Sequence, residues 1–373
     1  AGNVLTTLVS GAALPASSYT PDSTGPMLLD FSVDLDTGLL VLSFSELVRA
    51  DSFDPTGITL LETRPFDPEI IGPGAQSFTI TDATANLFKL SNRSGVDLEF
   101  TLAKPDLDSV KALRRLATDR NTTALSMAGK TITDMSYNPV DDISHESAML
   151  PSSYAPDTTP PTLDAFSLDM NAGMLVLHFS EAIEERSVDL AAGGVVLSQF
   201  SSMRAGGVVP LSGGDVSRGE GALSTDVSIA LTIVDLNALK LARIGTETNR
   251  TWLTVEAGAF RDMAGLPLLR IIESGIVGGG ALRASSVTLD TTAPRLTRFV
   301  VDRSARSLHL TFDETVDVDA LLPEAVVLTT AGQTERIVRD STVSRAALYP
   351  ATELVFALDA ACELAVAVDA DGS

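Results

Sequence analysis

The clearest pattern in the chain is a strict alternation of apolar and other side chains, which occurs three times. Every second residue is Leu, Leu and then Phe in segments 39–44, 174–179 and 307–312. The intervening positions become more polar from the first copy to the third. A period of two with one constant apolar face is typical of a strand that packs on one side only. Each segment is therefore predicted to be a strand of a β-sandwich.

Each of these segments follows a second predicted strand and a tight turn. The earlier strand holds Phe31, Phe166 or Phe299. The turn is Asp-Thr-Gly at 36–38 and Asn-Ala-Gly at 171–173, whereas the third copy reads Ser-Ala-Arg at 304–306. Glycine adopts the positive φ of such turns without steric cost. The turn is therefore expected in the first two copies, whereas the third copy lacks the glycine that favours it.

The hairpin belongs to a longer internal repeat. Asp22, Asp157 and Asp290 open the three copies, and Glu46, Glu181 and Glu314 close the alternating strands with the same offsets of 135 and 133 residues. Such a period indicates tandem domains. The predicted organisation is the tail of a preceding repeat at 1–21, complete repeats at 22–156 and 157–289, and a partial repeat at 290–373.

A second half-repeat supports this division. Residues 98–140 match residues 229–269, with Pro139 aligned to Pro267. Between its strands, Val110, Leu113 and Leu116 are spaced for one helical face within 108–116. This segment is too short to form a layer of the fold, so a helical crossover between the two sheets of a sandwich is expected.

Both ends of the chain fall inside a repeat. Residues 14–22, LPASSYTPD, match residues 150–157, LPSSYAPD, and the third copy stops near its crossover. This pattern indicates a window on a longer array, which would account for the lack of a signal sequence at residue 1.

Composition narrows the range of partners. The 373 residues carry a net charge of −23, and 26 Lys and Arg are scattered among 49 Asp and Glu. A protein that binds nucleic acid or an anionic membrane needs clustered basic residues, so neither is expected as a partner of this chain. No apolar run reaches the roughly 18–20 residues that cross a bilayer, so no membrane insertion of this segment is expected. Cys362 is the single cysteine and excludes a disulfide within the chain.

These motifs resemble a known repeat type. The segments Asp157–Glu181 and Asp262–Gly265, with copies at Asp22–Glu46 and Asp290–Glu314, are similar to the bacterial-type immunoglobulin-like repeats of large surface proteins. The resemblance implies an all-β fold of tandem immunoglobulin-like sandwiches placed end to end, and an extracellular location. Stalks, adhesins and filaments such as flagellar mastigonemes are built from arrays of this kind.

Three N-x-S/T sequons begin at Asn92, Asn121 and Asn249. The last two occupy equivalent loops after the crossover, which favours N-linked glycans on an extracellular array. Capping of the loop by Asn and Thr is the alternative.

The recurrent acids suggest a second kind of site. Asp157, Glu181 and Asp262 are candidate calcium ligands, because calcium needs about six to eight oxygen atoms that carboxylates and backbone carbonyls supply. Equivalent acids occur at Asp22, Glu46 and Asp134. The competing interpretation is that these acids cap turns, and no D-x-D-x-D-G loop is present.

Catalysis has little support in the sequence. The three histidines, His145, His178 and His309, are not a repeated set, and no nucleophile elbow, zinc helix or phosphate loop occurs. The leading hypothesis is therefore a non-enzymatic subunit of an extracellular filament that assembles with copies of itself or with other subunits. The rival is the stalk of a cell-surface adhesin, stiffened by calcium.

Overall fold

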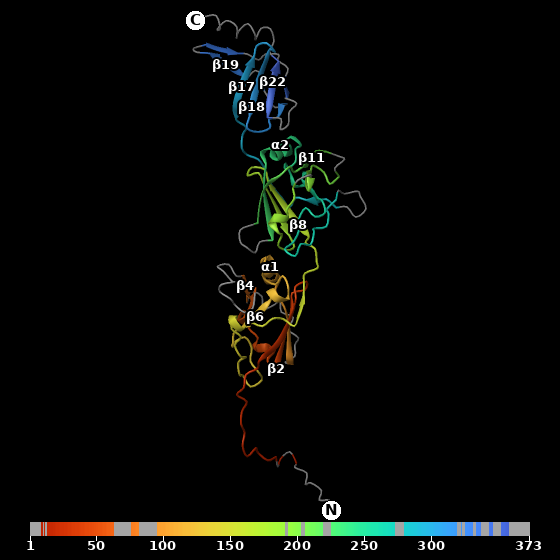
Figure 1. Cartoon of the computed structure of the whole chain (residues 1–373). Coiled ribbons are helices and arrows are strands. Elements are labelled where there is room, and N and C mark those ends of the chain that lie inside the picture. The colour runs from red at the N-terminus through yellow and green to blue at the C-terminus, as the bar shows by residue number, and fades with distance from the viewer. Residues whose placement is uncertain are drawn as a thin grey trace, which may run out of the picture. The chain divides into compact units, whose positions relative to one another are not determined.

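The computed structural model divides the chain into two compact units, Ala1–Asp157 and Thr158–Ser373 (Figure 1). It describes residues 9, 11, 13–62, 76–81, 95–190, 193–202, 206–218, 225–272, 280–318, 322, 325–330, 333–336, 343–345 and 352–357. Asn92 and Cys362 lie outside these residues.

The first unit contains one sandwich of two sheets. One sheet has the order β5-β2-β1-β7, and the other has the order β4-β3-β6. The strands are β1 (Leu28–Asp34), β2 (Leu39–Val48), β3 (Ile58–Leu61), β4 (Ser77–Thr79), β5 (Gly95–Thr101), β6 (Ala124–Met127) and β7 (Ser153–Ala155). Strand β7 joins the outer edge of β1 in parallel, across about 120 residues of sequence.

The second unit begins with an equivalent sandwich. Its sheets have the orders β12-β13-β9-β8-β16 and β11-β10-β14-β15. The strands are β8 (Leu163–Asp169), β9 (Met174–Phe179), β10 (Val195–Ser198), β11 (Val208–Pro210), β12 (Gly214–Arg218), β13 (Asp226–Leu231), β14 (Trp252–Val255), β15 (Leu282–Arg283) and β16 (Ser286–Thr288). Strand β16 lies parallel to β8, as β7 does to β1.

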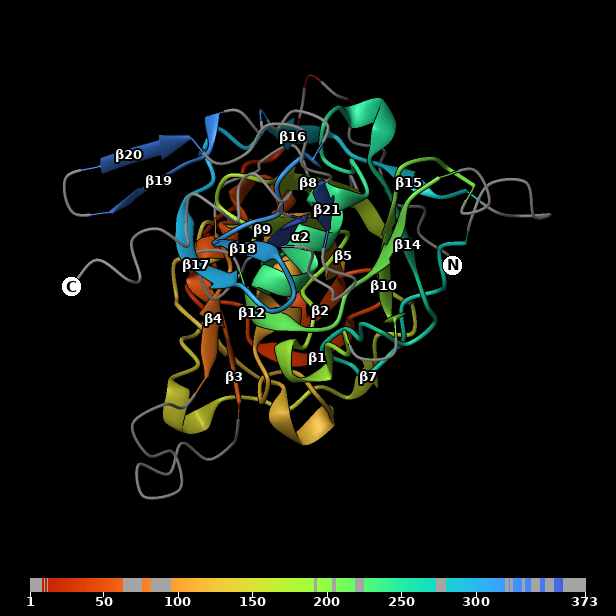
Figure 2. The same cartoon turned by 90° about the horizontal axis from the view of Figure 1, so that it is seen from above.

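A further sheet, β17-β18-β22-β21, and a two-stranded ribbon, β19-β20, follow in the same unit. Their strands are β17 (Leu296–Asp302), β18 (Ser307–Phe312), β19 (Val327–Thr330), β20 (Gln333–Arg336), β21 (Val343–Arg345) and β22 (Glu353–Ala357). Figure 2 shows the ribbon projecting away from the β17–β18 sheet. Strand β17 is an outer strand of its sheet within the described part of the chain.

The predicted alternation is confirmed. Leu40, Leu42 and Phe44 on β2 are buried, and the residues between them are only partly buried. Strand β9 alternates in the same way. These side chains join two large cores, one in each complete sandwich. The fold is all-β, built from tandem immunoglobulin-like β-sandwiches with one short helix between the sheets of each complete repeat.

The first hairpin of each repeat keeps its geometry even where its glycine is lost. Gly38 and Gly173 have φ of 72° and 68°, and Arg306 takes the same left-handed conformation with φ of 53°. In the third copy the side chain of Asp302 accepts hydrogen bonds from the backbone amides of Ser304 and Ala305. Two other aspartates, Asp34 and Asp169, cap the equivalent turns. This cap holds the turn without glycine.

The helical crossovers are confirmed, but the predicted range of the first one was wrong. Helix α1 spans Lys104–Ala112 and α2 spans Ile233–Leu241, each leading from one sheet of its sandwich to the other. The predicted range was 108–116. The helix starts earlier because Pro105 stands in its first turn, where its missing N–H costs nothing. Leu113 is already extended, so the apolar spacing continued beyond the helix.

Candidate functional site

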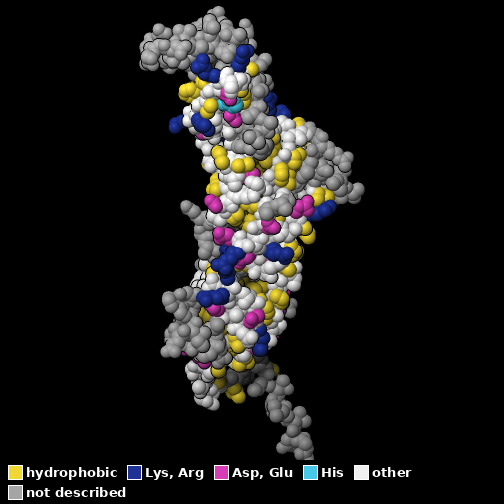
Figure 3. All heavy atoms as spheres, turned by 45° about the horizontal axis from the view of Figure 1, so that its top comes forward, with side chains coloured by type: hydrophobic (Ala, Val, Ile, Leu, Met, Phe, Trp, Pro, Cys, Tyr) yellow, Lys and Arg dark blue, Asp and Glu magenta, His cyan; other side chains and the backbone are white. Residues whose placement is uncertain are grey.

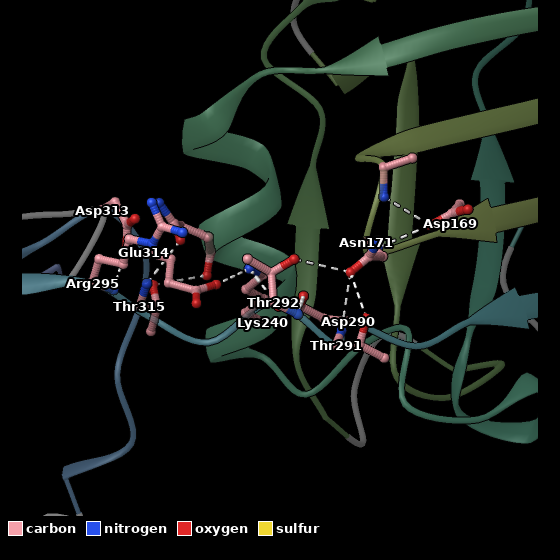
Figure 4. A network of polar contacts seen from close by, with 12 residues as sticks. Asp169, Asn171, Lys240, Asp290, Thr291, Thr292, Arg295, Asp313, Glu314 and Thr315 are labelled. Atoms are coloured by element: carbon pink, nitrogen blue, oxygen red, sulfur yellow. Dashed lines mark hydrogen bonds and ion pairs between the residues drawn. The ribbon is translucent and has the colours of Figure 1, made fainter.

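The residues with the strongest polar contacts lie where one repeat joins the next. In the second unit, Lys240 near the end of α2 points towards two acids of the following repeat (Figure 4). Its ammonium group lies 2.7 Å from a carboxylate oxygen of Asp290 and also pairs with Glu314. The three side chains are 11–23% exposed, so this is a largely buried network of one cation and two anions.

The pKa values follow from this geometry. Burial alone would lower the pKa of Lys240, but its hydrogen bonds to Asp290 and Glu314 outweigh that effect and raise it. Burial would likewise raise the pKa of Asp290, but Lys240 and the amide of Thr292 hold it below its usual value. Lys240 and Asp290 therefore both stay charged around neutral pH.

Two asparagines add hydrogen bonds to the same joint. The amide of Thr315 donates to the side-chain oxygen of Asn237 on α2 at 2.9 Å. In the turn after β8, the side-chain oxygen of Asn171 accepts from Thr291 and Thr292 (Figure 4). The linker after β16 is thus fixed to the second repeat, and the loop after β18 is fixed to α2.

The first unit contains the same kind of ion pair. Lys111, at the position of α1 that Lys240 has in α2, lies 2.8 Å from Asp157, and their side chains are 11% and 5% exposed. The repetition of Asp157 and Asp290 marked them as candidate site residues, but the lysines that pair with them were not predicted from the sequence. The signal was available, because both lysines are the second-last residue of a repeated helix.

The other recurrent acids form a cluster in the first unit. Carboxylate oxygens of Asp22, Glu46 and Asp134 lie within 4.8 Å of one another. Burial raises the pKa of Glu46, and the negative charges of Asp22 and Asp134 raise it further. This cluster has the donor type that divalent cations prefer.

Of the predicted ligands, Glu181 and Asp262 lie in the second unit with carboxylate oxygens within 4.8 Å, and both side chains are buried. Asp157 is the last residue of the first unit. Turn capping is also present: Asp262 accepts from the amide of Leu266, and Asp134 accepts from the amides of Ser136 and Asn138. Burial would raise the pKa of Asp134, but hydrogen bonds from the side-chain amide of Asn138 and from these two backbone amides hold it below its usual value.

The two equivalent sequons present exposed asparagines. Asn121 lies in a 3-10 turn, Arg120–Thr122, and Asn249 lies in the matching turn, Thr248–Arg250. The sequon hydroxyls of Thr123 and Thr251 are buried and donate to the backbone at the start of each turn. The threonines therefore fix the loop, and the asparagine side chains face solvent.

We expect the chain produced in a glycosylating host to carry N-glycans at Asn121 and Asn249, because both side chains are accessible. Intact-mass measurement before and after enzymatic deglycosylation tests this. Replacing each Asn with Gln should remove one glycan mass. Replacing Asn3, which lies in no sequon, should leave the mass distribution of glycoforms unchanged. A chain whose mass is insensitive to deglycosylation would contradict the prediction.

The histidines on the strands take part in cross-strand pairs. Nδ1 of His178 lies 2.8 Å from Asp226, and Nδ1 of His309 lies 2.9 Å from Glu353. Ser43 and Asp97 form the corresponding contact in the first unit. On the face seen in Figure 3, basic and acidic side chains are interspersed on each unit. These polar faces have the character of a solvated sheet surface.

Comparisons with known proteins give no family assignment. No protein-family model and no curated protein matches the chain. Among solved structures, the N-terminal part of the bacterial S-layer protein SbsC is 9% identical, with 70% of this chain and 44% of that one covered and a TM-score of 0.19. Extracellular domains 3–5 of Drosophila OTK are also 9% identical, with 93% and 90% covered and a TM-score of 0.19. The eight N-terminal immunoglobulin domains of the Down syndrome cell adhesion molecule are 12% identical, with 90% and 33% covered and a TM-score of 0.16.

The chain spans less than half of the S-layer fragment. TM-scores this low describe no common superposition of whole chains. Within the described residues, neither α-helix is long and apolar enough to cross a bilayer.

Proposed function

We propose that this chain is a structural subunit of an extracellular filament, which assembles through contacts between repeats and between copies. The observation that carries the proposal is the fixed joint within the second unit. There, Lys240 of one repeat is paired with Asp290 and Glu314 of the next.

A filament transmits force from repeat to repeat, so its joints must resist bending. A linker without side-chain contacts would act as a flexible hinge. In the second unit the linker is instead tied down by a buried ion-pair network and by hydrogen bonds to Asn171 and Asn237. A load along the chain would then act on packed sandwiches and on these joints.

The finer assignment within this class is a flagellar hair of the mastigoneme type. It is supported by the resemblance of the repeated motifs and by the two exposed sequon asparagines, Asn121 and Asn249. The non-enzymatic role is part of the same proposal.

Negative-stain electron microscopy of the native material tests the filament. Fibres with an axial repeat set by a whole number of sandwich domains, decorated by antibodies to this chain, are expected. Antibody labelling of single tethered projections that never join end to end would favour an adhesin stalk instead.

An adhesin stalk stiffened by calcium is the second candidate, and the cluster of Asp22, Glu46 and Asp134 favours it. These three carboxylates would supply part of the oxygen shell that calcium needs, with backbone carbonyls or water supplying the rest. Burial and then repulsion by Asp22 and Asp134 raise the pKa of Glu46, and the cation would relieve that repulsion.

Calcium is expected to raise the melting temperature of the full chain, and Glu46→Gln should abolish that increase. A raised pKa means that the charged form of Glu46 is disfavoured in the folded state, so stability increases as pH falls through that pKa. Glu46→Gln should therefore be at least as stable as the parent chain in the presence of chelator. Calorimetry with calcium and with chelator measures both effects.

Glu99→Gln is the matched control, because it removes the same charge from an exposed position on β5. It should keep the response to calcium. Equal melting temperatures of the parent chain in calcium and in chelator would exclude the cation site.

A further inference from the structure

The first and last strands of each complete repeat lie side by side. Strand β1 opens the first repeat and pairs in parallel with β7, which closes it. Strands β8 and β16 do the same in the second repeat. The chain enters each pair at the start of one strand and leaves it at the end of the other. These two end-strand pairs therefore lie directly on the path by which tension along the chain crosses each sandwich.

The parallel direction decides how such tension acts on the backbone hydrogen bonds. Tension pulls β1 back from its first residue and pulls β7 forward from its last residue. Because the two strands run in the same direction, they are pulled past one another along their length. The hydrogen bonds of a parallel pair are evenly spaced along it, so they are then loaded together. Strands pulled from the same end would instead separate one bond at a time, at a lower force.

A serine strengthens one end of each pair. Ser152, directly before β7, donates its backbone N–H and its hydroxyl to the carbonyl of Phe31, at 2.9 and 3.2 Å. Ser285, directly before β16, makes both bonds to the carbonyl of Phe166, at 2.8 and 2.6 Å. The two phenylalanines are completely buried in the cores of their repeats. The anchored carbonyl thus belongs to a residue that is itself fixed by packing.

The other end of each pair is held in a similar way. The amide of Leu35 donates to the carbonyl of Ala155 at 3.0 Å. In the second repeat, the amide of Met170 donates to the carbonyl of Thr288 at 2.9 Å. Leu35 and Met170 are also members of the two cores. Both ends of the last strand are therefore bonded to residues that are packed inside the sandwich.

We propose that the two end-strand pairs are the force-bearing elements of this chain, and that Ser152 and Ser285 set their mechanical strength. Tension cannot reach the rest of a sandwich until its end-strand pair has broken, so the bonds of that pair control the rate of unfolding under load. Two donors on one carbonyl add a bond that the strand ladder alone would lack. This inference rests on the proposed filament for its biological role, since a filament carries tension from repeat to repeat.

The first repeat has one further tie on its last strand. The hydroxyl of Tyr154 on β7 donates to the carbonyl of Ala117 at 2.8 Å. Burial, followed by the negative charges of Asp119 and Asp157, raises the pKa of Tyr154 to about 12, so the hydroxyl keeps its proton at neutral pH. The second repeat has Val287 at the equivalent position. This tie therefore distinguishes the two end-strand pairs.

Force-clamp spectroscopy of the full chain, held by its two ends, tests the proposal. At constant tension the two complete repeats should unfold in separate extension steps of roughly 40 nm each, given about 3.4 Å per released residue. Ser152→Ala removes the hydroxyl bond, keeps the backbone bond and should speed one step about 5-fold. Ser285→Ala should speed the other step by a similar factor. Tyr154→Phe should add to the effect of Ser152→Ala and leave the second repeat at its parent rate.

Two kinds of control separate the anchor from its surroundings. Ser153→Ala and Ser286→Ala make the same change one residue later, at exposed side chains, and should leave both rates unchanged. Thr131→Val separates mechanical strength from stability, because the buried hydroxyl of Thr131 donates to the carbonyl of Ala128 in the turn after β6. This variant should lower the stability of the first repeat in urea without changing its unfolding rate under tension.

The force-bearing role and the proposed filament fail in different ways. Unchanged unfolding rates in both Ser152→Ala and Ser285→Ala would overturn the force-bearing role, as would an equal acceleration by Thr131→Val. Either result alongside filaments in micrographs would leave the filament intact. Faster unfolding of the serine variants, together with native material that shows only single tethered projections, would retain the force-bearing pairs and count against the filament.

Discussion

Replacing Phe166 with alanine is expected to destabilise its sandwich by about 3–5 kcal/mol, whereas the same change at Phe299 should cost less than about 1 kcal/mol. The two residues occupy the same repeat position. Phe166 is completely buried in the core of the second repeat, and Phe299 is 55% exposed. Removal of a buried ring loses its transfer free energy and leaves a cavity, and neither penalty applies fully at Phe299.

Urea unfolding monitored by Trp252 fluorescence measures the first change, because Trp252 is the only tryptophan and lies on β14 of the same sandwich. Hydrogen exchange of the backbone amides of β18 measures the loss of stability in Phe299→Ala. Phe31→Ala, in the first unit, is a matched control that should behave like Phe166→Ala. Equal costs at Phe166 and Phe299 in monomeric chain would contradict the exposed position of Phe299.

Replacing Lys240 with methionine should destabilise the joint between the second and third repeats by about 2–3 kcal/mol at neutral pH. Methionine preserves most of the apolar stem but leaves Asp290 and Glu314 as neighbouring, largely buried carboxylates. Breaking a buried pair costs more than the pair contributes, because the remaining charges keep their desolvation penalty. Exchange of the Thr315 amide, which donates to Asn237 on the same helix, reports the loss directly.

The effect should depend on pH with a definite sign. The pKa of Asp290 lies below its usual value of about 3.8 in the folded chain. Its contribution is therefore present above about pH 4 and is lost as pH falls through the folded pKa. The difference between parent and Lys240→Met should be largest near neutral pH and should shrink in acid.

Lys104→Met is the control for the Lys240 variant. Lys104 pairs with Asp108 one turn along α1, and its side chain is 64% exposed, so its loss should cost about 0.5 kcal/mol or less. If the two variants were equally stable, the buried network would have no special role at the joint.

The candidate site was predictable only in part. The repetition of Asp22, Asp157 and Asp290 drew attention to three acids at the predicted joints between repeats. The contacts of Asp157 and Asp290 were not predicted, because each pairs with a lysine on a helix, 46 and 50 residues earlier respectively. Two of these acids, Asp157 and Asp290, pair with lysines, and Asp22 lies with two other acids.

The sequence by itself determined the elements that depend on near neighbours. Alternation at 39–44 and 174–179 specifies strands with one buried face, since successive side chains of a strand point to opposite sides. The aspartate before each turn caps it locally, so the hairpin survives at Arg306 without glycine. These properties need only a few consecutive residues.

The tertiary structure decided the features that join distant segments. It placed β7 on β1 across about 120 residues, gave Asp290 its lysine, and left Phe299 exposed although it matches a core residue. Burial depends on what covers a strand, and edge pairing depends on which segment reaches it. Neither is encoded in the period of a single strand, so identical motifs at Phe166 and Phe299 end in different environments.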